Sequence, residues 1–568
     1  MFRPNESSVP TIRQWEEAGA SLSSALSKYL DLCISLGPDS QKDGTPPKAL
    51  AIRIDSALEK LYAQLDQQID QSRLILARTR NQVLSPISCF PSEVLSEIFA
   101  YAIFDPVDPV DPFDPASMQD SLVTMYQSLH SLLGVCSTWR NIALARGLFW
   151  SIIPIMEYPG SDLMVRNPGK PLSTSLSLER SGNADLHLAT IASERDRDLD
   201  FTKYASRFRS INILSGSIYT IGELLSNFVK SGSDLQVSSL FLCHKINLPS
   251  SQIPPLCTSL SSLRSFKYIN FEDLLESISV LRLSNVMFDW DRVQFSHQLV
   301  ELELQNLTLG YDSELTKLLT SLSTATGLRT LKFISVVTYP IDTLPYITTK
   351  SSISLPSLQT MVARDLFFNT LDSLLSSITS RSHRLTLHLT KRTCEIIPAE
   401  DSVPEGAAAH RIVDLFRQVN VNTLLLEAFQ HEGSWFSTIS IWGLLHAMPD
   451  IETLRMHDWD YPTEFCEMIQ RPNIPGGFEF PSFKNIHITQ ARIRDEEAFK
   501  NMVASYFKSL ERMELAGTIL EEWEDWKIGG DLEGEEPIVA WFEENVPDFQ
   551  LKNPIIPPEF CIPVWQLW

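Results

Sequence analysis

The chain is short of basic residues: 47 Lys and Arg stand against 70 Asp and Glu among 568 residues, a formal net charge of −23. Neutralising nucleic-acid phosphates requires clustered Lys and Arg, so the deficit argues against a general nucleic-acid-binding protein. It equally argues against docking on anionic membranes. The charge is uneven, because residues 501–568 carry four basic and fourteen acidic residues, whereas residues 1–150 carry twelve and seventeen.

Long apolar runs and paired cysteines are also missing. No run of 18 apolar residues occurs, so we expect no membrane-spanning helix, and residues 1–6 lack the apolar run of a secretory signal. The eight cysteines are scattered without a C-x-x-C pair, which is typical of reduced intracellular thiols rather than of a disulfide framework. We therefore expect a protein of the cytoplasm, the nucleus or both.

Motifs of catalysis and nucleotide binding are absent as well. The chain has no G-x-G-x-x-G, no G-x-x-x-x-G-K-[ST], no H-E-x-x-H and no G-x-S-x-G. Cys243 and His244 are adjacent, and adjacent strand residues point to opposite faces, so we do not expect a nucleophile–base pair there. His383 and His388 have no Asp or Cys at metal-ligand spacing. We expect no enzyme, cofactor or metal site.

The first part of the chain combines a polar stretch with a long amphipathic segment. Residues 1–47 are Ser-rich, and we expect them to be partly disordered apart from a short amphipathic piece around 22–36. Between 48 and 84, apolar residues recur at spacings of four and three, which predicts an amphipathic helix. About three heptads are marginal for a coiled coil, so packing on the next domain is favoured over a homodimer seam in residues 48–82.

Residues 85–155 carry short helical patterns with many large apolar residues. Pro91 and Glu93 stand where a first helical turn favours proline and acids. One apolar face at helical spacing follows, made by Val94, Leu95, Ile98, Phe99 and Ala102. A second periodic run contains Met125, Leu129, Leu132, Leu133, Cys136, Trp139 and Ala143. We expect short helices here.

This region resembles the F-box, a three-helix module that docks on the linker subunit of cullin-type ubiquitin ligases. The matching elements are Phe90-Pro91, Val135-Cys136-x-x-Trp139-Arg140 and Leu148 to Trp150. With the preceding helix, the region is similar to the F-box-like family of mushroom-forming (basidiomycete) fungi. The resemblance implies linker contacts from Pro91, Glu93, Val94, Leu95, Ile98, Phe99, Leu133, Val135, Cys136, Trp139, Arg140 and Trp150. Some of these residues, Phe99 and Trp139 first, are expected to hold the helices together instead. Near the start of the first helix, Pro91, Glu93 and Leu95 are the favoured contacts.

One segment departs from the family pattern. Residues 105–115 contain four Asp-Pro steps with a period of three. Proline bars helix and favours extended polyproline-II geometry. A solvated spacer loop is the favoured interpretation, and a contact with an adaptor or partner is the alternative.

From about residue 170 to 518, an apolar theme of the form L-x-x-L-x-L recurs, mostly at steps of 21 to 32 residues. Copies begin at Phe208, Val237, Leu263, Ile278, Leu299, Leu328, Leu358, Val421, Ile451, Phe483 and Leu510, with 385–389 as a looser member. This period is the signature of leucine-rich repeats. One unit cannot bury its strand alone, so stacked units predict a solenoid with a parallel sheet, and residues 314–322 and 372–378 are expected helices between strands.

The repeats are degenerate. Asn at the strand exit, typical of the standard repeat, occurs at Asn285 and Asn306. The rival fold is a doubly wound α/β domain, which predicts a Gly-rich phosphate loop that the chain lacks. Residues 176–188 are similar to the entry strand that follows the F-box in the same fungal family.

Residues 519–568 mix acids with aromatics, and five of the twelve Trp lie after position 520. A purely solvated tail would have few aromatics, so parts of this segment are expected to pack. A cap with a polar outer face is favoured, because a solenoid needs its last core covered. The alternative is an exposed acidic-aromatic peptide that engages a basic partner.

The expected fold is therefore α/β: an N-terminal amphipathic helix and a three-helix F-box, followed by a leucine-rich-repeat-like solenoid with a parallel sheet. The resemblance implies a substrate-recognition subunit of a cullin-RING (SCF-type) ubiquitin ligase, which binds the linker protein and cullin complex through the F-box and a protein substrate through the repeats. Ubiquitin-transfer chemistry would reside in partner subunits. The alternatives are a ubiquitin-independent interaction scaffold and an enzyme on another α/β fold.

Overall fold

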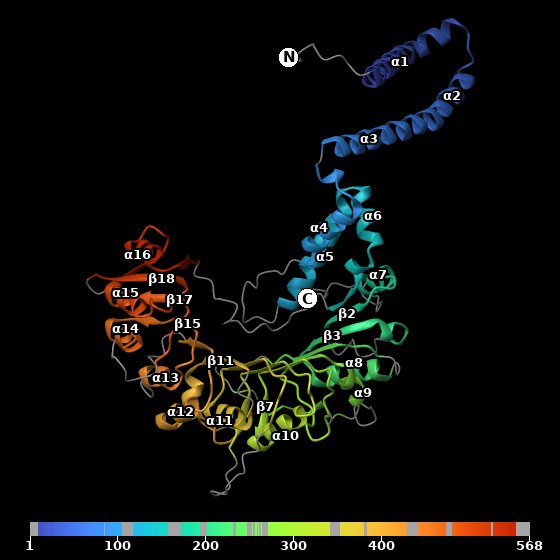
Figure 1. Cartoon of the computed structure of the whole chain (residues 1–568). Coiled ribbons are helices and arrows are strands. Elements are labelled where there is room, and N and C mark those ends of the chain that lie inside the picture. The colour runs from blue at the N-terminus through green and yellow to red at the C-terminus, as the bar shows by residue number, and fades with distance from the viewer. Residues whose placement is uncertain are drawn as a thin grey trace. The chain divides into compact units, whose positions relative to one another are not determined.

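Figure 1 shows the computed structural model of the chain. The structure describes residues 10–84, 86–104, 117–156, 172–192, 201–230, 235–246, 271–340, 353–379, 383–400, 402–428, 441–472, 480–523, 526–552 and 560, with isolated positions between 246 and 271. The chain divides into two compact units, Met1–Leu95 and Ser96–Trp568.

The first unit is helical. It contains α1 (Pro10–Lys42), α2 (Pro47–Ser56), a π-helical turn (Ala57–Leu61), α3 (Tyr62–Leu84), a 3-10 turn (Pro86–Cys89) and the beginning of α4 (Ser92–Phe104). The helix α1 spans 33 residues and so extends well beyond the short amphipathic piece expected around 22–36. Pro10 begins it, where the missing N–H of proline leaves no hydrogen bond unmade, and Gly44 follows its end at φ 72°.

The helices α1 and α2 contain no buried residue, and Leu30, Ile34 and Ile52 are each more than half exposed. Among the helices that the structure describes, none combines the length and the hydropathy needed to span a bilayer.

The second unit begins with three short helices and a 3-10 turn. After the greater part of α4 come α5 (Ser117–Val135), α6 (Ser137–Ala145) and the turn Gly147–Trp150. The Cys136 Sγ caps α6 by accepting a hydrogen bond from the Trp139 N–H at 3.5 Å. The Trp150 Nε1–H donates to the Ala143 carbonyl at 2.9 Å and ties the turn to α6. The Asp-Pro segment 105–115 lies outside the described residues.

A long sheet follows, with 16 strands among the described residues. Strands that are neighbours on its main path follow one another along the chain, and the pairs from β1 to β18 are parallel. A doubly wound sheet reverses its strand order, whereas here each strand is added at the growing edge. The sheet is therefore a leucine-rich-repeat-like solenoid, as the period predicted.

The strands of the main path are β1 (Ile152–Met156), β2 (Leu186–Ala192), β3 (Phe208–Ser215), β4 (Ser239–His244), β5 (Val280–Ser284), β6 (Glu301–Gln305), β8 (Thr330–Ile334), β10 (Thr360–Arg364), β11 (Arg384–Leu389), β14 (Thr423–Glu427), β15 (Thr453–His457), β17 (Asn485–Ile493), β18 (Arg512–Trp523) and β19 (Trp526–Asp531). The short strand β16 (Asp460–Tyr461) pairs with β17. Two small pairs lie apart, β7 (Thr308–Tyr311) with β9 (Val337–Tyr339) and β12 (Glu395–Ile396) with β13 (Glu405–Gly406).

Helices lie along one side of this sheet (Figure 1). They are α8 (Ile218–Lys230), α9 (Phe271–Ser277), α10 (Asp312–Leu322), α11 (Phe368–Ser377), α12 (Ala409–Phe416), α13 (Ile441–Ala447), α14 (Thr463–Ile469) and α15 (Glu496–Ala504). The apolar residues of each repeat theme fill the space between the layers, and Leu299, Leu302 and Leu304 are buried in one core with Leu315 and Leu318 of α10.

The repeat theme locates the strands well. Every predicted copy falls on a strand of the sheet except the one at 263–268, most of which lies outside the described residues, and β4 pairs directly with β5. The entry needs correction. Residues 172–180 form the helix α7, which ends before Gly182 at φ 56°, so only Leu186–Ala192 forms a strand there. The sheet also begins earlier, at β1, which pairs with β2.

A left-handed residue directly follows five of the strands: Asn285, Asn306, Ser335, Asp365 and Asp458, with φ between 48° and 63°. A sixth, Gln490 at φ 50°, lies inside β17, where the register with β18 shifts. At Asn306 the backbone N–H still donates to the Ile334 carbonyl of the next repeat at 2.9 Å. Asn and Asp tolerate this conformation because their short polar side chains can bond locally. The position after the strand therefore keeps the left-handed conformation even where the residue is not Asn.

The end of the chain completes the solenoid. After β18 the strand β19 turns back antiparallel, α16 (Pro537–Asn545) follows, and β20 (Asp548–Leu551) pairs parallel with β18. Phe542 of α16 is buried and its ring lies 5.9 Å from that of Phe499 in α15. Glu543 and Glu544 on the same helix are exposed. The sheet thus continues past the expected end at residue 518, and α16 covers the last core with a polar outer face.

Candidate functional site

The face of the sheet away from the helices carries a regular array of polar side chains. On each strand the residues that alternate with the core residues point to this face. We define the open face as these alternate positions of β5, β6, β8, β10, β11, β14, β15, residues 485–489 of β17 and residues 512–516 of β18. Its charged members are Arg282, Glu301, Glu303, Lys332, Arg364, Arg384, Glu427, Arg455, Arg512 and Glu514.

The open face therefore holds six cationic and four acidic side chains, whereas the whole chain has a net charge of −23. Because parallel pairing keeps equivalent positions in register, these side chains form rows across the repeats. The fold concentrates positive charge on this face even though the protein as a whole is acidic.

In the earlier repeats these charges pair with one another across strands. Arg282 Nη2 lies 3.0 Å from Glu301 Oε1, and Lys332 Nζ lies 3.0 Å from Glu303 Oε2 and 3.3 Å from Glu301 Oε1. Gln305 also donates a hydrogen bond to Glu303. Glu303 is buried, so these partners are needed to satisfy its charge.

In the later repeats the open face carries three imidazoles. His388 Nε2 lies 2.9 Å from Glu427 Oε2, His457 Nδ1 lies 2.9 Å from Thr489 Oγ1, and His487 Nδ1 lies 2.8 Å from Glu514 Oε2. Burial is the largest influence on each, and it lowers the pKa of all three histidines despite the nearby carboxylates. The three rings are therefore predominantly neutral at pH 7.

A residue from the C-terminal end of the chain lies among these imidazoles. The ring of Phe560 stacks on His457 with centroids 5.0 Å apart at 29°, and it meets His388 edge-on at 5.3 Å and 87°. Arg364 donates a hydrogen bond to the Phe560 carbonyl. Phe560 is 1% exposed. Sequence reasoning missed this contact because nothing local links residue 560 to strands that lie some hundred residues or more earlier in the chain.

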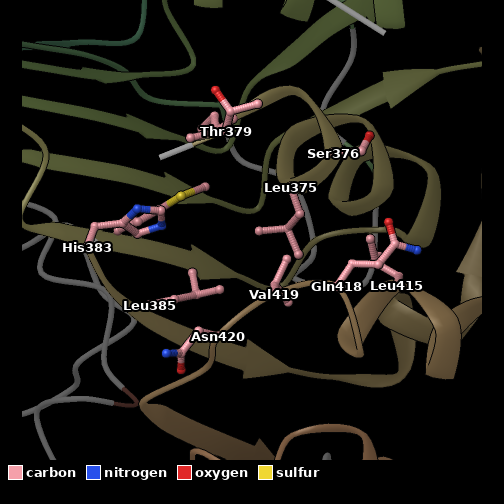
Figure 2. A pocket seen from close by; sticks show the side chains of 11 residues that line it. Leu375, Ser376, Thr379, His383, Leu385, Leu415, Gln418, Val419 and Asn420 are labelled. Carbon is pink, nitrogen blue, oxygen red and sulfur yellow. The ribbon is translucent and has the colours of Figure 1, made fainter. Parts of the chain in front are cut away.

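A cavity of about 310 Å³ lies on the helix side of the sheet, between β10, β11, α11 and α12. Figure 2 shows His383, Asn420 and Gln418 around it together with Leu375, Leu385 and Val419. The volume is at the lower end of that of ligand pockets. Among the described residues that line it, His383 is the one titratable side chain, so these residues offer no acid–base pair.

The cysteine beside a histidine does not form a reactive pair. Cys243 is buried, and burial raises the pKa of its thiol to about 11. His244 follows it on β4, where successive side chains point to opposite faces. Among the described residues, no three His, Cys, Asp or Glu side chains are placed to hold a metal ion together.

The residues singled out by the F-box resemblance divide by exposure. Leu95, Phe99 and Trp150 are buried, and the rings of Phe99 and Trp139 lie 4.8 Å apart. The half-buried members are Leu133, Cys136 and Trp139. The exposed members are Pro91, Glu93, Val94, Ile98, Val135 and Arg140. Burial thus places part of the set in the interior of the module and leaves the rest accessible.

Two arginines form side-chain hydrogen bonds among these helices that the sequence pattern did not predict. Arg146 donates to Ser96 Oγ at 2.5 Å and to Glu97 Oε1 at 2.7 Å, which joins the end of α6 to α4. Arg140 Nε donates to the Leu133 carbonyl at 2.9 Å, which joins α6 to the end of α5. Both arginines therefore stabilise the arrangement of the helices.

Comparison with known proteins adds one remote likeness. No protein-family model and no curated protein matches the chain. Among solved structures, the crystal structure of the leucine-rich repeat-containing protein LegL7 from Legionella pneumophila aligns with a TM-score of 0.31 at 14% identity. The alignment covers 62% of this chain and 97% of that protein. The assignment of a leucine-rich-repeat-like solenoid stands on the strand order and register of the sheet itself.

Proposed function

We propose that this chain is the substrate-recognition subunit of a cullin-RING (SCF-type) ubiquitin ligase. The helices α4 to α6 dock on the linker protein, and the open face of the solenoid binds a protein substrate. The observation that carries the proposal is a set of exposed apolar side chains on a helical module whose own core is already filled. The order of the motifs along the chain, which resembles that of the F-box, supplies the identity of the partner.

The filled core comprises Phe99, Met125, Leu129, Phe149 and Trp150, all buried. Outside it, Ile98, Val135 and Leu148 remain exposed, with Val135 at 55%. Large apolar side chains left exposed on a small module favour an interface, because covering them releases ordered water. We therefore assign the linker contacts to the exposed residues Ile98 and Val135. Arg140, which is also exposed, is a further candidate.

The proposal makes the chain an adaptor. Neither the cavity beside α11 nor the neighbourhood of Cys243 supplies a reactive pair, so ubiquitin transfer is assigned to partner subunits. It also implies a place in the cytoplasm or the nucleus, where such ligases act.

Co-purification of the linker protein tests the proposal. Full-length wild type should bring the linker and the cullin with it, and Val135→Asp should lose both, because a carboxylate in an apolar interface cannot be solvated. The matched control is Val403→Asp in the solenoid, a valine that is 81% exposed and lies outside the module. This control should retain the linker.

Burial argues against Leu95 as a linker contact, so Val135 is the better position for a substitution that disrupts docking. Leu95 is buried, so Leu95→Asp would unfold the module and its loss of binding would be uninformative. Linker retained by Val135→Asp combined with Ile98→Asp, or no linker with folded wild type, contradicts the ligase assignment.

A ubiquitin-independent scaffold is the second candidate. It is favoured by the Asp-Pro segment between α4 and α5, which departs from the F-box pattern. On that alternative, wild type captures a partner through the open face but never the linker.

A further inference from the structure

We propose that the open face carries a peptide site for an aromatic side chain with an acidic neighbour, and that Phe560 of the same chain occupies this site when no partner is bound. The inference rests on the part of the proposed function that assigns partner binding to the open face, and not on linker docking.

The site is built from three strands. Arg364 ends β10, His388 lies in β11 and His457 ends β15, and all three side chains are buried. Glu427 holds His388, and Thr489 holds His457, both at 2.9 Å. Because strands and neighbouring side chains fix these positions, an entering ring meets a surface that is already organised.

The chemistry of the site suits an aromatic ring. His457 offers a ring face and His388 meets the ring at its edge, which are the offset-stacked and edge-to-face arrangements that aromatic pairs prefer. The guanidinium of Arg364 then holds the backbone carbonyl of the same residue. A single aromatic residue of a peptide supplies both groups, its ring and its own backbone carbonyl.

The charged groups close to the site are largely paired off. Asp365, which follows Arg364, lies 2.8 Å from Arg392, and Asp458, which follows His457, pairs with Arg492. Asp365 and Asp458 therefore have cationic partners without an incoming peptide. The aromatic ring is recognised by its shape and by stacking, and not by an ion pair.

Phe560 is a replaceable occupant. Among the described residues, Phe560 contacts side chains of the open face and does not belong to the apolar core that lies between the sheet and the helices. Displacing Phe560 therefore leaves the core intact. A residue that held the fold together would instead belong to that core.

Charge indicates the kind of partner. The open face has six cationic and four acidic side chains, so it favours an acidic peptide. The chain's own occupant fits this rule, because Glu559 precedes Phe560. We therefore assign to the site a protein segment in which an Asp or Glu stands next to Phe, Tyr or Trp.

Fluorescence anisotropy with full-length protein tests the inference. The probe is a labelled synthetic peptide with the sequence of residues 554–566, in which Ser replaces Cys561. Phe560→Ala protein should bind this probe at least about tenfold more tightly than wild type, because the site is no longer occupied. Tyr219→Ala, which removes an exposed aromatic residue of α8, is the control and should bind like wild type.

Two altered probes complete the experiment. A Phe560→Ala probe should lose binding to the Phe560→Ala protein, and a Glu559→Lys probe should bind more weakly than the parent probe. Equal affinity of wild type and Phe560→Ala for the probe, or undiminished binding of the Phe560→Ala probe, overturns the inference. Phe560→Leu protein provides a second variant: it keeps an apolar side chain and should still bind the probe more tightly than wild type, because a stacked ring is lost.

Linker co-purification separates this result from the ligase assignment. Phe560→Ala should carry the linker as well as wild type does. Loss of the linker in wild type would contradict the ligase proposal and leave the peptide result standing, whereas failure of the peptide binding would leave linker docking untouched.

Discussion

At the scale of single residues, burial decides what each titratable group contributes. Five histidines lie on strands of the sheet, and burial is the first cause that lowers the pKa of each: His187, His244, His388, His457 and His487. The same effect raises the pKa of the Asp312 carboxyl to about 6, although Thr338 donates a hydrogen bond to it. If these histidines and Asp312 were exposed to solvent, each would have the same pKa in the folded and unfolded states, and stability would hardly depend on pH between about 5 and 7.

These shifts predict weaker folding in mild acid. Because the folded histidines have a pKa below that of an unfolded histidine, near 6.5, the unfolded state binds more protons as the pH falls through that value. Stability is therefore full above about pH 6.5 and declines below it. Asp312 acts in the opposite direction near pH 6, but it is one group against five histidines.

Urea unfolding at pH 7.5, 6.5 and 5.5 measures this effect, and the midpoint should fall between the last two values. His388→Gln should show a smaller decline, because it removes one of the five groups. A midpoint that is constant or rises on acidification would contradict the assignment of neutral buried histidines.

At the scale of elements, successive repeats approach so closely that some positions admit only glycine. Gly327 lies in the connection between α10 and β8, and a Cβ added there would lie far inside van der Waals contact with the carbonyl oxygen of His297 in the preceding repeat. The constraint comes from the stacking distance between units and not from the local chain. Gly216, between β3 and α8, has no atom of the described residues within 4 Å of its added Cβ.

Gly327→Ala should therefore lower the free energy of unfolding by about 2 kcal/mol, as overpacking does when backbone cannot move away. Gly216→Ala should change it by less than about 0.5 kcal/mol. The urea midpoints of both variants, compared with wild type, decide the matter. Equal effects of the two substitutions would contradict the prediction, because they would show that the backbone of adjacent repeats can move to accommodate the added Cβ.

At the scale of the whole molecule, the solenoid behaves as a one-dimensional stack whose ends need covering. The helix α16 performs this role at the C-terminal end. Phe542 packs against Phe499 of α15 and, at 5.5 Å, against Phe549 of β20. Stability near this end therefore depends on a few contacts with the final segment, whereas β1 to β3 lie many repeats away.

Phe542→Ala should destabilise the last repeats by about 3–5 kcal/mol, the usual cost of truncating a buried phenylalanine. Amide hydrogen exchange should show faster exchange in β17, β18 and α15, with β1 to β3 unchanged. Glu543→Ala, on the exposed side of the same helix, should leave all protection as in wild type. Uniformly faster exchange along the chain would instead indicate a single cooperative unit.

The sequence by itself determined the elements whose cause is local and periodic. The theme at Leu299, Leu302 and Leu304 predicts a strand because each apolar residue is buried by the equivalent residues of the neighbouring repeats, and the same rule holds at Leu328 and Leu358. The helix-like runs between strands, at 314–322 and 372–378, likewise located the helices α10 and α11. Where the local signal was partial, the expectation fell short: the amphipathic piece expected at 22–36 is part of the longer helix α1, and β1 lies before the first recognisable repeat.

Tertiary structure alone decided which side chains are exposed on the two surfaces that we propose for binding. The pattern at Val94 to Phe99 fixes a helix but does not fix which side chains its neighbours cover, and burial assigned Phe99 to the core and left Ile98 exposed. The open face gathers positive charge within an acidic chain because register places distant residues in rows. The contact of Phe560 with His388 and His457 joins residues more than a hundred positions apart, and loop closure of that kind has no signature in local sequence.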